Sequence, residues 1–400
     1  MKIVFSNLSA FGHAYPLVPL ALAARDAGHD VLYATDEQIH PMLHQLGFPV
    51  ATVGMPIRAA FAEVFAETEA EIGKLPWQEW LEPEVRTFNE VLPRRFATDL
   101  LPVLRAERPD LVVYEVGNPG AGLAARRLGI PAVCHSFGRA GAVDRGEQWR
   151  KRCMELLRKV AGEIGAELPE EYFRGDHYLD ICPPSLQEPS FAAYPARVPL
   201  RPVQFSEPGE LPAIVTAERK RPLVYLTLGT VVGTVPALRA AVDGLSTLDV
   251  DVLVAAAGPK VSVDEFGELP ANVHLERWVP QADVLPLVDL AVHHGGSGTS
   301  LGAAAAGVPQ LFLPVAFDMF LNAGAVSAAG AGRTLLPEGV ERVDDRRRSD
   351  VVAAAAVAEA AGELLHDTDV RQAAKAVAEE IAAMPSPAEV AARLPELASS

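Results

Sequence analysis

Residues 293–318, HHGGSGTSLGAAAAGVPQLFLPVAFD, decide the fold class of this chain. Two histidines follow a short apolar run, glycines and hydroxyl residues come next, and an alanine-rich run ends at Gly307 and Pro309. This order predicts a strand, a tight glycine turn and the N-terminus of a helix. Because the first N–H groups of a helix have no partner inside it and its dipole is positive there, the pattern predicts a diphosphate site.

The turn itself carries the candidate ligands of that site. Glycines let the backbone approach a phosphate closely, hydroxyl groups add donors, and a histidine adds a ring N–H. The candidates are His294, Gly296, Ser297, Gly298 and Thr299. We interpret His293 as structural. The alternative for the whole stretch is an ordinary turn in which small residues serve packing alone.

Other glycine motifs fit this stretch less well. A dinucleotide fingerprint starting at Gly296 has Leu301 where its third glycine belongs, and the lysine of a phosphate-binding P-loop is absent. A nucleophile elbow fails because Thr299 takes the place of its last glycine.

Composition limits the function classes. The chain has 400 residues, 49% hydrophobic and 22% charged, which suits two or three globular domains. The net charge of −17 argues against a nucleic-acid partner. Three cysteines lie far apart, which favours reduced thiols. No signal peptide or membrane-spanning run is evident, so we expect a cytoplasmic protein.

The N-terminal half alternates short apolar runs with helical stretches from Lys2 to Val53, which predicts a parallel, doubly wound α/β sheet. Ligands bind at the carboxyl ends of strands in such sheets. Two candidates belong to that edge: His13, in a predicted loop over residues 9–15, and Glu115, near the end of a strand over residues 109–116.

Residues 55–85 break this alternation with acidic and aromatic side chains. We interpret the segment as a helical excursion that could line an apolar acceptor pocket, and a packed helical cover is the alternative. The candidate acceptor residues are Phe61, Phe65, Trp77 and Trp80.

Proline-rich residues 206–222 read as a linker between two α/β halves. We expect an N-terminal acceptor domain over residues 1–205 and a C-terminal donor domain over residues 223–375. Residues 350–384 read as one alanine-rich helix. The chain ends in a helix, within residues 376–400, for which one placement is back on the N-terminal domain.

An ordered series of motifs carries a family resemblance. The motifs are Trp278-Val-Pro-Gln281, His294 to Thr299, Gly307-Val-Pro309, Pro314 with Asp318, FGHAYPLVPL at 11–20, and the strand at 109–113. The series resembles the nucleotide-sugar signature of GT-B glycosyltransferases, in the form found in antibiotic, macrolide and enediyne pathways of actinomycetes. The resemblance extends over nearly the whole chain.

This resemblance implies two doubly wound, Rossmann-like domains facing across a cleft, inversion at the sugar carbon and no essential metal or other cofactor. It implies that Trp278 stacks on the base, Gln281 lies near the nucleoside, and His294, Ser297, Gly298 and Thr299 hold the diphosphate. It further places Thr230 near the phosphates and Asp318 at the sugar, and it makes His13 the catalytic base.

The sequence departs from the plant-type pattern of this family. Met319 replaces a glutamine, and Gly302 replaces an acidic residue at the ribose. Both changes weaken an assignment of UDP-glucose and agree with a deoxysugar on dTDP. Glu115 stands where many relatives have aspartate, so its partnership with His13 is left open.

We therefore expect a dTDP- or UDP-sugar-dependent glycosyltransferase that acts on a hydroxyl of an apolar secondary metabolite. Its partners would be the nucleotide sugar and the hydrophobic acceptor, without nucleic acid or a membrane span. The alternatives are a non-catalytic nucleotide-sugar-binding auxiliary protein, a sugar-nucleotide epimerase and an NAD(P) oxidoreductase. The oligomeric state is left open, with a homodimer as one option.

Overall fold

The computed structural model describes residues 1–68, 81–140, 146–168, 177–229, 234–256, 266–315, 318–340 and 351–399. The chain divides into two compact units. The first holds residues 1–182, 188–201 and 385–400, and the second holds residues 183–187 and 202–384. The division therefore falls at residue 201, before the predicted linker, and the last helix belongs to the first unit. Each unit is described by itself.

The first unit is built on a parallel sheet in the order β3-β2-β1-β4-β5-β6-β7. Its strands are β1 Lys2–Ser6, β2 Asp30–Thr35, β3 Val50–Thr52, β4 Leu111–Glu115, β5 Ala132–His135, β6 His177–Asp180 and β7 Arg197–Pro199. The five inner strands are almost entirely buried because helices cover both faces, which is why their sequences are largely apolar runs.

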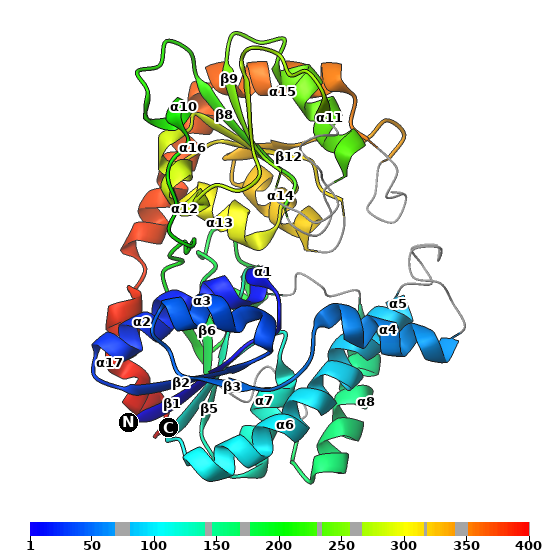
Figure 1. Cartoon of the computed structure of the whole chain (residues 1–400), viewed down its shortest axis with the longest axis vertical. Helices are drawn as coiled ribbons and strands as arrows, with labels where there is room; N and C mark the ends of the chain where they lie inside the picture. The colour runs from blue at the N-terminus through cyan, green and yellow to red at the C-terminus, as the bar shows by residue number, and fades with distance from the viewer. Residues whose placement is uncertain are drawn as a thin grey trace. The chain divides into compact units, whose positions relative to one another are not determined.

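Helices cover this sheet in two layers (Figure 1). On one face lie α6 Leu92–Glu107, α7 Pro119–Arg127 and α8 Glu147–Ile164. On the other lie α2 Val18–Asp26, α3 His40–Gln45 and α17 Pro387–Leu397, where α17 packs against α2. The remaining helical elements of this unit are α1 Phe11–Ala14, η1 Tyr15–Leu17, η2 Glu37–Ile39, α4 Ile57–Thr68, α5 Leu81–Arg86, a π-helix (η4) at Thr87–Val91 and α9 Pro189–Ala192.

Two predictions about local structure are wrong. The expected loop over residues 9–15 contains the one-turn helix α1, so His13 projects from a helical backbone. The expected single helix over residues 350–384 is two helices, α15 Ala354–His366 and α16 Thr368–Ala383. The break falls at Asp367, whose carboxylate accepts the N–H groups of Asp369 and Val370 and so begins a new helix.

The second unit repeats the architecture with a parallel sheet in the order β10-β9-β8-β11-β12-β13. Its strands are β8 Leu223–Thr227, β9 Asp251–Ala255, β10 Val273–Glu276, β11 Leu290–His293, β12 Gln310–Phe312 and β13 Gly332–Thr334. Helices α11 Val235–Leu245 and α15 pack on one face. Helix α12 Gln281–Val284, η7 Leu285–Leu287 and α13 Ser297–Ala305 pack on the other. Helices α10 Ala213–Thr216 and α14 Met319–Ala328 complete the unit.

No helix in the described part of the chain is both long and apolar enough to cross a bilayer.

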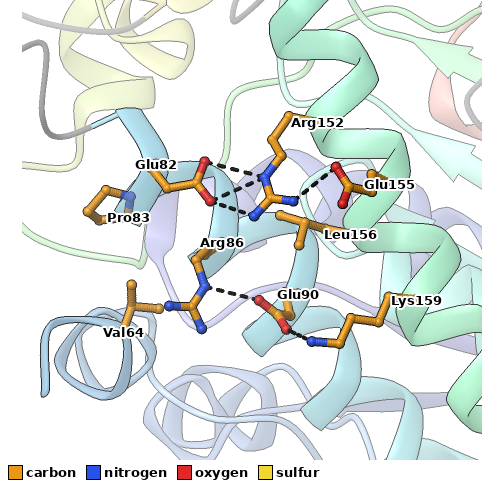
Figure 2. A pocket seen from close by; sticks show the side chains of 9 residues that line it. All are labelled: Val64, Glu82, Pro83, Arg86, Glu90, Arg152, Glu155, Leu156 and Lys159. Carbon is orange, nitrogen blue, oxygen red and sulfur yellow. Dashed lines mark hydrogen bonds and ion pairs between the residues drawn. The ribbon is translucent and has the colours of Figure 1, made fainter. Parts of the chain in front are cut away.

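One buried carboxylate joins four helical elements of the first unit, and Figure 2 shows its contacts with two of its partners, Arg86 and Lys159. Glu90, on η4, is 4% exposed and accepts hydrogen bonds from Arg86, Arg94 and Lys159. Burial by itself would raise the pKa of Glu90, but hydrogen bonds from these three cations outweigh burial and hold the pKa at about 2. Glu90 is therefore ionised in the folded protein at any pH above the acid range.

We predict that Glu90→Gln lowers the free energy of unfolding by roughly 2–3 kcal/mol at pH 7, since a shift from 4.5 to about 2 corresponds to about 3 kcal/mol. A carboxylate whose pKa is lower in the folded state than in the unfolded state stabilises the folded protein. This contribution is complete above the unfolded pKa of 4.5 and is lost as the pH falls toward the folded pKa of about 2. Urea unfolding of the parent and of Glu90→Gln at pH 7 and at pH 3 measures the free energy of unfolding at both pH values.

The control is Glu155→Gln, because the Glu155 side chain is 68% exposed and pairs with Arg152 alone among the cations described. Its effect should stay within about 0.5 kcal/mol at both pH values. Equal effects of the two variants at pH 7 would contradict the account.

Candidate functional site

The carboxyl-end edge of the first sheet brings His13 and Glu115 together. Nδ1 of His13 lies 3.1 Å from Oε2 of Glu115. The Glu115 side chain is fully buried and its Oε1 accepts the backbone N–H of Gly117 at 2.5 Å, while the His13 side chain is 21% exposed. The extra methylene of glutamate therefore does not prevent the contact. A carboxylate on Nδ1 favours the tautomer with its lone pair on Nε2.

Two neighbours of this pair were not foreseen from the sequence. The ring of Phe137 meets the His13 imidazole edge-on, with centroids 5.0 Å apart. A Cβ on Gly117 would lie 2.9 Å from Oε1 of Glu115 and 3.1 Å from Cε1 of His13. A side chain at residue 117 would therefore require Glu115 and His13 to shift, and the contact with His13 comes from a distant segment of the chain.

The glycine turn in the second unit has the predicted strand, turn and helix geometry. Gly295 has φ +91°, and a Cβ there would lie 2.7 Å from the carbonyl oxygen of Met319. Nδ1 of His293 accepts the N–H of Gly295, while Nε2 of His293 contacts Oε1 of Gln310 at 2.9 Å. His293 is fully buried, and burial lowers its pKa to about 3. The structural interpretation of His293 is confirmed.

His294 directly follows β11 and precedes α13, and its ring lies between two glycine backbones. A Cβ on Gly229 would lie 2.6 Å from Cε1 of His294, and a Cβ on Gly296 would lie 2.5 Å from its Nε2. Burial lowers the pKa of His294 to about 4, although a hydrogen bond with the backbone of Thr227 opposes the shift. His294 is therefore neutral near pH 7 and could offer a phosphate a ring N–H, but no charge.

The two hydroxyl groups predicted to hold the diphosphate are engaged inside the protein. Oγ of Ser297 donates to Oδ2 of Asp318 at 2.8 Å, and Oγ1 of Thr299 donates to Oε1 of Gln281 at 3.2 Å. The first turn of α13 instead presents the backbone N–H groups of its first three residues, which a helix leaves without partners. A Cβ on Gly298 would meet nothing within 4 Å, so this turn is open to a ligand.

Asp318 occupies the N-cap position of α14 but does not cap it. Its Oδ2 accepts hydrogen bonds from Ser297 and from Nδ2 of Asn322. Nδ2 of Asn322 also donates to the carbonyl oxygen of Gly295 at 2.9 Å. Asn322 thus fixes both the turn and the candidate sugar ligand. The sequence offers one signal for it, a lone amide in an otherwise apolar helix.

Gln281 is the first residue of α12, and Trp278 lies just before this helix. Trp278 is 42% exposed, so the alternative of a core tryptophan does not hold. A Cβ on Gly209 would lie 2.5 Å from Cζ3 of Trp278, so the indole rests on this glycine. Gln281 accepts hydrogen bonds from Tyr225 and Thr299 through the same oxygen.

Three predicted residues lie outside the described ranges, and two others lie on α4. Thr230, Trp77 and Trp80 are not described. Phe65 is 3% exposed and stacks on the half-buried Phe61, with centroids 6.5 Å apart. Phe65 therefore packs as part of a helical cover, and Phe61 offers the greater accessible surface.

A cavity of about 460 Å³ in the first unit is not this site. Its lining comes from α4, α5, η4 and α8, and its charged groups pair with one another (Figure 2). None of the candidate catalytic or donor residues lines it.

The two doubly wound α/β units, with the groups that they carry, define the structural class of this protein. One carries an imidazole beside a buried carboxylate, and the other carries an open helix N-terminus beside an exposed tryptophan. Together they are the arrangement of a GT-B glycosyltransferase, and solved structures of that class match the whole chain.

The chain belongs to the erythromycin biosynthesis protein CIII-like family. The N-terminal family model matches residues 22–229 and the C-terminal model matches residues 239–397. The chain is therefore an enzyme, a glycosyltransferase that acts with nucleotide sugars, and the oxidoreductase alternative is wrong. It is 33% identical to the L-demethylnoviosyl transferase of Streptomyces niveus, over 98% of this chain and 97% of that protein.

Solved structures agree with this assignment. The glycosyltransferase SnogD from Streptomyces nogalater has a TM-score of 0.76 and 27% identity, over 100% of this chain and 99% of that one. The spinosyn rhamnosyltransferase SpnG, complexed with thymidine diphosphate, also has a TM-score of 0.76 and 27% identity, over 99% and 100% of the two chains.

We predict that Gly117→Ala lowers kcat by roughly 10- to 100-fold, because the added methyl group forces His13 and Glu115 apart. Nucleotide binding, which belongs to the other unit, should not change. Steady-state kinetics and calorimetric titration with dTDP separate the two effects. Gly162→Ala, in open space on α8, is the control, and a Gly117→Ala enzyme as fast as this control would contradict the assignment of the pair.

Proposed function

We propose that this enzyme transfers a deoxysugar, with inversion and without a metal or other cofactor, from a dTDP- or UDP-sugar to a hydroxyl of an apolar secondary metabolite. The observation that carries the proposal is the 3.1 Å contact between His13 and the buried carboxylate of Glu115. Names of relatives support the substrate class, among them an elloramycin glycosyltransferase and a tylactone mycaminosyltransferase.

His13 would act as the general base. Its Nε2 lone pair takes the proton of the acceptor hydroxyl as the oxygen attacks the anomeric carbon from the face opposite the leaving diphosphate. Glu115 stabilises the imidazolium that forms. Its carboxylate is oriented before the reaction because the backbone N–H of Gly117 donates a hydrogen bond to its other oxygen, Oε1. One attack on the sugar carbon inverts its configuration.

The leaving diphosphate gains negative charge, and the first turn of α13 would stabilise it. Its backbone N–H groups are fixed before the reaction and therefore need no reorganisation. His294 would add a neutral donor beside them. Asp318 would bind a sugar hydroxyl, although its Oδ2 already accepts two hydrogen bonds within the unit.

We favour dTDP over UDP as the nucleotide. Gly302 offers no side chain to a ribose 2′-hydroxyl, and dTDP lacks that hydroxyl. SpnG is a relative whose structure holds thymidine diphosphate, which supports the same choice.

We expect His13→Ala to lower kcat by about 10²- to 10⁴-fold, the usual contribution of a general base, and Glu115→Gln to lower it less because the imidazole remains. Both variants should bind dTDP as tightly as the parent. Single-turnover transfer from a dTDP-deoxysugar to a panel of polyketide acceptors, with EDTA present, measures the effect. A fully active His13→Ala enzyme would sink the mechanism, and sugar exchange without an acceptor would favour the epimerase alternative.

Thermal unfolding with dTDP, UDP, GDP and NAD tests the donor site, because a ligand that binds the folded state raises Tm. We expect the largest rise with dTDP and its loss in Trp278→Ala, since base stacking contributes roughly 1–3 kcal/mol. Leu287→Ala is the control, because Leu287 is similarly exposed, at 41%. No rise with any nucleotide would count against the proposed donor site.

A further inference from the structure

Residues 204–209, which follow the division between the two units, touch three parts of the donor site. Gln204 packs over Gly302 on α13, Oγ of Ser206 accepts the N–H of Ala282 on α12 at 3.0 Å, and Gly209 lies under Trp278. All of these residues belong to the second unit. The segment therefore runs along the donor site from the helix of the phosphate turn to the candidate base platform.

Gln204 is the member of this segment that can reach a ligand. A Cβ on Gly302 would lie 2.7 Å from Cδ and 2.8 Å from Oε1 of Gln204, so the carboxamide lies directly over α13. Gln204 is half-buried. Among the residues described, no group hydrogen-bonds to its carboxamide, and neither of its polar atoms is fully buried. A donor and an acceptor are thus held beside the site and left to solvent.

The position of this carboxamide matches the middle of a nucleoside diphosphate. Gly298 and Gly302 lie on the same face of α13, four residues and about 6 Å apart. If the diphosphate binds at Gly298 and the base at Trp278, the ribose joins them and passes within reach of position 302. A 2′-deoxyribose that carries its phosphates on C5′ has a single hydroxyl, at C3′.

We propose that Gln204 is a donor-binding residue whose carboxamide hydrogen-bonds the ribose 3′-hydroxyl of the donor nucleotide. This inference rests on the proposed function, because it needs a nucleoside diphosphate in the α13 site. It adds a ligand from outside the glycine turn, at the place where Gly302 offers no side chain.

A thermodynamic cycle tests the contact. The dissociation constants of dTDP and of 2′,3′-dideoxythymidine diphosphate are measured by calorimetry for the parent and for Gln204→Leu, which keeps the packing volume over Gly302. The parent should bind dTDP about tenfold more tightly than the dideoxy analogue, as one hydrogen bond to a hydroxyl implies. In Gln204→Leu that preference should disappear, while affinity for the analogue stays at the parent value.

The outcomes separate the possible errors. A retained tenfold preference in Gln204→Leu overturns the inference. Equal weakening of both ligands also overturns it, because that result means the segment serves only to pack against Trp278. Failure of the parent to bind dTDP at all counts instead against the proposed donor class. Gln372→Leu, an exposed glutamine on α16, is the control and should match the parent.

Discussion

The donor site depends on the backbone turn at Gly295. This residue sits at φ +91° with the carbonyl oxygen of Met319 against it, so only glycine fits. The turn is held from both sides, because His293 accepts the N–H of Gly295 and Asn322 donates to its carbonyl oxygen. The direction in which α13 begins follows from this turn. The proposed diphosphate site therefore depends on hydrogen bonds that the buried side chains of His293 and Asn322 make with the backbone of Gly295, and neither side chain needs to touch the ligand.

The two units use different electrostatics. The catalytic corner holds a carboxylate in a fully buried position, where a charge has strong effects on its neighbours and needs hydrogen bonds to be tolerated. His294 gives the donor turn no positive charge near pH 7, since burial lowers its pKa to about 4. A chain with a net charge of −17 thus needs oriented N–H groups, rather than a positive field, to bind an anion.

The sequence was sufficient wherever the signal is local. Apolar runs and glycine turns predicted both parallel sheets, and the rule for strand ends placed His13 and Glu115 on one edge. The sequence was insufficient where the hydrogen-bond partners of a residue come from distant segments. The hydroxyls of Ser297 and Thr299 look free in a motif, but Asp318 and Gln281, about twenty residues away, engage them. Likewise, the sequence suggests that the glycines of the turn serve to let the backbone approach a phosphate. In the folded chain, a Cβ on Gly295 would meet the carbonyl oxygen of Met319, and a Cβ on Gly296 would meet the imidazole of His294.

The proposed binding residues and the proposed catalytic residues belong to different units. The described contacts of the glycine turn, Trp278 and Gln204 all lie within residues 202–384, and those of His13 and Glu115 lie within residues 1–182. Because each group is fixed by its own core, a substitution in one unit need not disturb the geometry of the other. In the proposed mechanism, the exposed indole and the open carboxamide select the nucleotide, while the buried carboxylate orients the His13 imidazole. On this proposal, donor choice and catalytic rate are set by different residues and can change independently.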